Sequence, residues 1–115
     1  MIDIIALTIA EQLGITVTEM RSDSRLRKFV IGRQALSYFL FKNKAVYDNI
    51  TLEQIGKFLN RHHSSIVVNV QKFGNALDIG YEKEVNLHNH LKESFPTLET
   101  AKQYAISKTY SMSKL

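Results

Sequence analysis

The sequence predicts an all-α domain of about six helices that includes a helix-turn-helix. Apolar residues recur at intervals of three and four along most of the chain, which is the spacing of one helix face. Two short apolar runs, at about residues 51–59 and 63–77, are joined by about three polar residues, the outline of a helix-turn-helix. The 115-residue chain has no cysteine, so we expect one core without disulfides or thiolate metal sites.

The first two helices are predicted from apolar spacing and end signals. Residues 3–13 place three apolar side chains on one face, and Gly14 follows where a left-handed C-terminal cap is expected. A shorter helix at about 17–21 is expected next, with Thr16 or Thr18 as its N-cap. The Ser-Asp-Ser run that follows predicts a polar break in the chain.

The longest helix is predicted from Leu26 to about Phe41. Its apolar stripe consists of Phe29, Ala35, Leu36, Phe39 and Leu40. Three basic residues of this region, Arg25, Lys28 and Arg33, are expected to lie largely off that stripe. Residues 43–49 then interrupt the periodicity.

The two helices of the helix-turn-helix follow this break. Thr51 precedes the first of them, and Gln54 three residues later completes a capping-box pattern. The second begins near residues 62–64 and is expected to end at about 77, with Gly56 at the close contact between the two helices. The adjacent valines at 67 and 68 could also form a strand, but the sustained helical spacing around them favours a helix.

A last helix and a tail complete the predicted organisation. The sixth helix covers about residues 81–93 and is ended by Pro96. We expect residues 1–95 to form one domain. The remaining segment, 96–115, is expected to be a tail that is partly helical or disordered, with order fading toward the terminus.

Positive charge is concentrated in the middle of the chain. Residues 21–72 contain ten basic and three acidic residues, a net charge of +7, whereas the rest of the chain has five basic and eight acidic residues, a net charge of −3. A surface without a special partner mixes the two signs, while a face that binds a polyanion concentrates one of them. The asymmetry favours nucleic acid as the partner.

The start of the second helix of the helix-turn-helix has the side chains of a DNA-reading element. It reads Arg61-His62-His63-Ser64-Ser65, and all five can form hydrogen bonds. Arginine is the usual bidentate reader of guanine, serine and histidine can donate or accept, and the free N–H groups of a helix start can bind phosphate. The alternative interpretation is a helix cap without further function.

A basic run over residues 21–33 is the second candidate element. Arginine in a loop before a helix can enter a narrow minor groove or lie between phosphates, whereas the alternative is a solvated helix face. Because both elements lie in the same positively charged segment, each supports the other.

Five segments resemble one known family: Ile9-Ala10-Glu11, Ser24-Arg25-Leu26-Arg27, Arg33-Gln34, Leu52-Glu53-Gln54-Ile55-Gly56 and Arg61-His62-His63-Ser64-Ser65-Ile66-Val67. They are similar to the C-terminal DNA-binding domain, domain IV, of the bacterial chromosomal replication initiator DnaA, which has a Trp-repressor-like helix-turn-helix fold. The last segment resembles the family signature RDHTTV. The resemblance runs from about Ile9 to Phe73.

The resemblance implies roles for individual residues. Arg25 would reach the minor groove, and Arg33 and Gln34 would contact major-groove bases or adjacent phosphate. His63, Ser64 and Ser65 would read bases, and the phosphate contacts would be Lys57, Arg61 and Lys72. With the neighbouring basic residues and the helix start, the predicted DNA-binding set is Arg25, Arg27, Lys28, Arg33, Gln34, Lys57, Arg61, His62, His63, Ser64, Ser65 and Lys72.

The chain also departs from the family pattern. His62 replaces an aspartate, which is expected to remove both a strong N-cap acceptor and a carboxylate able to accept from cytosine. Ser64 and Ser65 replace threonines whose methyl groups can contact thymine, so weaker thymine discrimination and a site other than the family's usual nine-base-pair box are expected. No GxxxxGK[ST] motif is present, so no nucleotide cofactor and no ATPase activity are expected.

Other function classes fit less well. Neither the adjacent histidines His62 and His63 nor His88-x-His90 point to one face, so no metal site is expected, and no serine-histidine pair has a carboxylate partner for catalysis. The apolar N-terminus is too short for a membrane span and lacks the basic start of a signal peptide, so a cytoplasmic protein is expected.

We therefore expect a bacterial or phage protein that binds double-stranded DNA in replication initiation or transcriptional regulation. The alternative is a protein-interaction module derived from the same fold, which would use the basic face or the C-terminal tail.

Overall fold

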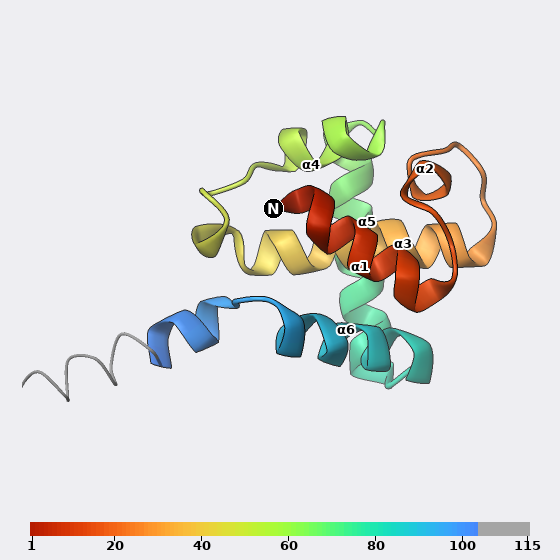
Figure 1. The fold of residues 1–115 in the computed structure, drawn as a ribbon. Helices are drawn as coiled ribbons and strands as arrows, with labels where there is room; N and C mark the ends of the chain where they lie inside the picture. Colours follow the sequence, from red (N-terminus) through yellow and green to blue (C-terminus); the bar gives the residue numbers. More distant parts are fainter. Residues whose placement is uncertain (104–115) are drawn as a thin grey trace, which may run out of the picture.

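Helix α3 (Arg27–Lys42) lies at the centre of the fold and contacts each of the other α-helices in Figure 1. The computed structural model describes residues 1–103, and no strand occurs within that range. The elements around α3 are α1 (Ile2–Leu13), α2 (Val17–Met20), the 3-10 helix η1 (Lys44–Val46), α4 (Leu52–Leu59), α5 (His63–Ile79) and α6 (Glu82–Ser94). The predicted all-α class with about six helices is confirmed, and both valines lie within α5.

The predicted end signals act as expected. Gly14 ends α1 with a φ of 70°, and a capping box pairs Thr16 with Glu19 at the start of α2. A second capping box pairs Thr51 with Gln54 at the start of α4. Helix α5 continues past the predicted end at residue 77, because the next left-handed cap is Gly80, with a φ of 88°. The prediction that the helix near residues 26–41 is the longest is therefore wrong, since α5 has 17 residues and α3 has 16.

The core is formed where the apolar faces of the helices meet on α3. Every α-helix contributes a fully or almost fully buried apolar side chain, and the largest of these are Ile5, Ile9, Met20, Ile31, Leu36, Phe39, Leu40, Ile55, Leu59, Ile66, Phe73 and Leu87. The stripe predicted for α3 is buried in full. Removing such side chains from water supplies about 1.5–3 kcal/mol each, which holds α4 and α5 in a fixed relation to α3.

Helix α6 lies below α3 and against the lower end of α5 in Figure 1, and the chain after it stays attached to the domain. Residues 98–103 form a further helical segment. The backbone N–H of Leu98 donates to Oδ1 of Asn43 at 2.9 Å, and the Tyr47 hydroxyl donates to the carbonyl oxygen of Pro96 at 2.5 Å. The first residues of the predicted tail therefore pack on the end of α3, while residues 104–115 lie outside the described residues.

No helix within residues 1–103 is both long enough and apolar enough to span a membrane.

Close packing at Gly56 predicts a stability effect. A Cβ atom at this position would lie 2.5 Å from the backbone carbonyl oxygen of Arg61. Gly56→Ala is expected to lower the free energy of unfolding by about 1–3 kcal/mol, because the backbone around Arg61 must move to make room for the Cβ atom. This loss should exceed the gain from the higher helix propensity of alanine. Urea unfolding followed by circular dichroism measures the change. Gly74→Ala is the matched control, since its Cβ would meet only ring atoms of the Tyr38 side chain; equal losses in both variants would contradict the prediction.

His88 of α6 predicts a pH dependence of stability. Its ring packs against Tyr38 and Phe73, and its Nδ1 atom is buried without a hydrogen-bond partner among the described residues. Burial, and then the charge of Lys92, lower the pKa of His88. The folded state therefore binds fewer protons than the unfolded state, so stability should be lost as the pH falls below about 6.5.

Urea unfolding midpoints at pH 7.5 and pH 5 test this effect. The wild-type protein should lose more stability between the two pH values than His88→Gln, which cannot titrate. Equal losses would show that His88 does not contribute.

Candidate nucleic-acid interface

An open, polar hollow separates the α2–α3 loop from α5. Its volume is about 540 Å³, and half of the predicted DNA-binding residues line it: Arg25, Arg33, Gln34, Arg61, Ser65 and Lys72. Four of these are cations, and Asp23 is the one acidic residue at the hollow. The fold thus brings together residues that are as far apart in the sequence as Arg25 and Lys72.

The side chain of Arg33 supports the α2–α3 loop through hydrogen bonds to its backbone. Its guanidinium donates to the carbonyl oxygens of Met20 at 3.0 Å, Ser22 at 3.2 Å and Ser24 at 2.7 Å. The side chain is only 6% exposed, so the expectation that Arg33 lies largely off the buried stripe is wrong. Burial, and then the nearby charge of Arg61, lower the pKa of Arg33. The three carbonyl oxygens offset the cost of burying this charge.

The same loop is tied to the turn before α5. An amino group of Arg61 donates to the carbonyl oxygen of Ser22 at 2.5 Å, and Nε of Arg21 donates to that of Phe58 at 2.7 Å. In return, Nδ2 of Asn60 donates to the carbonyl oxygen of Arg21 at 3.2 Å. These bonds make the loop and the turn one connected unit.

The start of α5 carries the exposed side chains of His62, His63 and Ser64. Nδ1 of His62 accepts from the backbone N–H of Ser64 at 3.3 Å and lies 2.9 Å from its hydroxyl oxygen. The expected loss of an N-cap acceptor is therefore wrong, because the imidazole replaces the carboxylate in that role. The two histidine rings lie face to face at a tilt, with centroids 4.1 Å apart.

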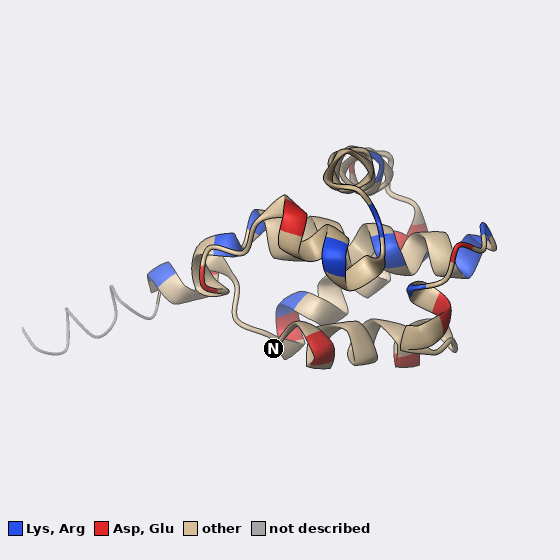
Figure 2. Ribbon diagram, turned by 90° about the horizontal axis from the view of Figure 1, so that it is seen from above, with Lys and Arg blue, Asp and Glu red and all other residues tan. Residues whose placement is uncertain are grey.

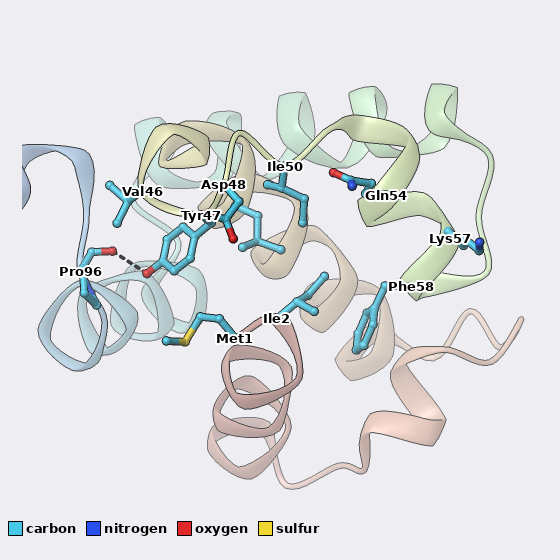
Figure 3. Close-up of a pocket in the computed structure, with 11 residues that line it drawn as sticks. Met1, Ile2, Val46, Tyr47, Asp48, Ile50, Gln54, Lys57, Phe58 and Pro96 are labelled. Atoms are coloured by element: carbon cyan, nitrogen blue, oxygen red, sulfur yellow. Dashed lines mark hydrogen bonds between the residues drawn. The ribbon is translucent and has the colours of Figure 1, made fainter.

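Three predicted residues lie away from the hollow. Arg27 forms an ion pair with the buried Glu84 of α6 at 3.4 Å, and Lys28 lines a separate depression beside Glu82. Lys57 of α4 lies at the edge of a third hollow, near the N-terminus of α1 (Figure 3). Gln34 does line the first hollow, but its side chain is only 6% exposed.

The third hollow differs in chemistry from the first. It has a volume of about 820 Å³ and is lined mainly by apolar side chains, among them Ile2, Ile50 and Phe58 (Figure 3). Tyr47 closes one end through its bond to Pro96, and burial raises the pKa of the Tyr47 hydroxyl. This hollow lacks the cluster of cations that a polyanion requires.

Charge is separated between the two sides of the fold. Figure 2 shows acidic residues on α1, which carries Asp3 and Glu11 and no lysine or arginine. Basic residues lie in the α2–α3 loop and in the turn that leads into α5, which is seen end-on. A polyanion is therefore attracted to the loop and the start of α5 and repelled by α1.

The sequence analysis did not identify Val68, the apolar side chain that α5 contributes to the first hollow. Val68 lines it, together with Asn69, from the exposed side of α5. The signal was present, since Val68 follows Ser64 by one turn of helix and precedes Lys72 by another. Within residues 1–103, no group of three metal-ligating side chains is positioned to hold an ion.

Comparison with known proteins shows a family match. The family described as bacterial dnaA protein helix-turn-helix matches residues 2–73, which run from the start of α1 into α5 and cover more than half of the chain. No curated protein matches the chain.

The different surroundings of two arginines predict different effects on stability. Arg33→Met is expected to lower the free energy of unfolding by about 2–4 kcal/mol, because buried carbonyl oxygens lose their donor. Arg25→Met, which alters an exposed side chain, should change it by less than about 0.5 kcal/mol. Urea unfolding measures both, and hydrogen exchange at Ser24 and Leu26 should accelerate only in Arg33→Met. Similar stabilities for the two variants would contradict this assignment.

Proposed function

The chain belongs to the bacterial DnaA helix-turn-helix family, whose domain binds DNA, and we propose that it recognises a specific sequence in double-stranded DNA. In this proposal α5 enters the major groove and the α2–α3 loop enters the adjacent minor groove. The observation that carries the proposal is the cationic hollow between these two elements, because a phosphate backbone always separates a major groove from its neighbouring minor groove.

The proposed contacts follow from exposure and position. Arg25 is exposed on the loop and is assigned to the minor groove, where a narrow groove attracts arginine. His63, Ser64 and Ser65 are assigned to base edges, since the first turn of a recognition helix faces them. Lys72 at the hollow is assigned to the phosphate between the two grooves.

The remaining predicted residues surround this centre. Arg61 is half-buried, so we assign it both a phosphate contact and the bond that holds Ser22. Arg33 acts by positioning the loop through its three carbonyl bonds rather than by direct contact. Lys57 is assigned to phosphate where α4 crosses the backbone. The others are assigned smaller contributions, Gln34 within the hollow, where it is only 6% exposed, and Arg27, Lys28 and His62 outside it.

The biological role we propose is replication initiation or transcriptional regulation by DNA binding alone. The sequence contains no phosphate-binding GxxxxGK[ST] loop, so we propose that binding does not depend on ATP. The DNA-binding unit would comprise residues 1–95, supported by the segment around Leu98 that packs on Asn43.

A salt series tests DNA binding. Duplexes selected from a random library, labelled for fluorescence anisotropy, should bind more weakly as salt rises from 50 to 200 mM. The slope of log affinity against log salt concentration should be about −0.9 for each phosphate contacted. No binding at about 50 mM salt, or binding insensitive to salt, would overturn the proposal in favour of the protein-interaction module.

Two substitutions separate base reading from phosphate contact. His63→Ala is expected to reduce the discrimination between the selected duplex and an unrelated one by about 1–3 kcal/mol. Lys57→Ala should weaken both duplexes alike, because a phosphate contact carries no sequence information. Both side chains are exposed, so neither variant should unfold. A uniform effect of His63→Ala would contradict its assignment to bases.

A further inference from the structure

Four of the exposed residues of α5 form one row along its outward face. Spacings of four, three and four bring Ser64, Val68, Gln71 and Asn75 to one side of the helix. The buried side of α5, which carries Ile66 and Phe73, is opposite to them. If α5 lies in the major groove, this row faces the base edges.

Val68 is the apolar member of this row. It is 43% exposed, although α5 has a large buried face that accepts apolar side chains. Val67 is exposed to a similar extent, at 38%, but it lies to the side of the row and does not line the hollow. Val68 does line the hollow, together with Arg25, Ser65 and Lys72. It is thus an apolar group surrounded by side chains suited to phosphate and bases.

We propose that Val68 reads thymine, by packing its methyl groups on the C5-methyl group of one thymine in the major groove. This inference rests on the proposed function. Among the major-groove edges of the four bases, only that of thymine presents a methyl group, and valine has no polar side-chain atom with which to recognise any other feature. Cytosine would place its amino donor near a side chain that cannot accept a hydrogen bond.

Helix geometry limits where this thymine can lie. Val68 lies one turn beyond Ser64, a rise of about 6 Å along the axis of α5. Base pairs are spaced about 3.4 Å apart, so the thymine should lie within about two base pairs of the base that Ser64 contacts, whatever the inclination of α5 in the groove. Val68 also supplies an apolar contact that Ser64 and Ser65 cannot make, because serine has no methyl group.

The test replaces each thymine of the selected duplex in turn by deoxyuridine, which differs only by the missing methyl group. At one position, replacing thymine by deoxyuridine should lower the affinity of the wild-type protein about fourfold. This is the change expected for the loss of one buried methyl or methylene group. Val68→Ala should bind the thymine and deoxyuridine duplexes at that position equally well. Anisotropy titrations at constant salt measure both affinities.

Val67→Ala is the matched control, because it removes the same atoms from the neighbouring exposed position of the same helix. It should retain the fourfold preference. Alanine has a higher helix propensity than valine, so both variants should stay folded, which circular dichroism verifies.

The outcomes distinguish this inference from the proposed function. A preference for thymine that survives in Val68→Ala, or that is lost in Val67→Ala instead, would overturn the assignment while DNA binding itself stands. A wild-type protein that shows no fourfold loss at any thymine would also overturn it. Failure to bind any duplex would overturn the proposed function, and this inference with it.

Discussion

One backbone carbonyl oxygen, that of Ser22, connects the two halves of the candidate interface. Arg33 approaches it from α3 at 3.2 Å, and Arg61 approaches it from the turn before α5 at 2.5 Å. A carbonyl oxygen has two lone pairs and can accept from both guanidinium groups, each of which forms a charge-assisted bond. This shared acceptor helps to fix the position of the loop relative to α5. It therefore also sets the spacing between the two protein elements that would contact DNA.

This arrangement places two cations close together in a partly buried site. Their mutual repulsion opposes burial, and it is one of the causes that lower the pKa of Arg33. The site is stable because carbonyl oxygens of the loop surround Arg33, and because Arg61 also donates to the carbonyl oxygens of Leu59 and Asn60. A bound phosphate would add negative charge beside Arg33 and Arg61. The site is therefore complementary in charge to the DNA backbone that we propose as its partner.

The sequence was sufficient to predict the elements whose signals are local. The N-cap at Thr16, which was one of two candidates, the capping box at Thr51, the left-handed cap at Gly14 and the apolar stripe of α3 each depend on residues within a few positions. The burial of Arg33 could not be predicted, because its acceptors are backbone atoms, which every residue has. Arg27 illustrates the same limit, since its partner Glu84 is distant in sequence and carries no signal of pairing.

His62 occupies the position where the resemblance to the family implies an aspartate, and it keeps one role of that residue while changing another. An aspartate at this position caps the helix with a permanent negative charge, which a nearby phosphate would repel. The imidazole of His62 caps the helix through Nδ1 without that charge, as its contact with the N–H of Ser64 shows. The cap uses the lone pair of Nδ1, so this atom acts as an acceptor toward the helix and not as a donor toward phosphate. Attraction of phosphate then depends on the arginines around Ser22.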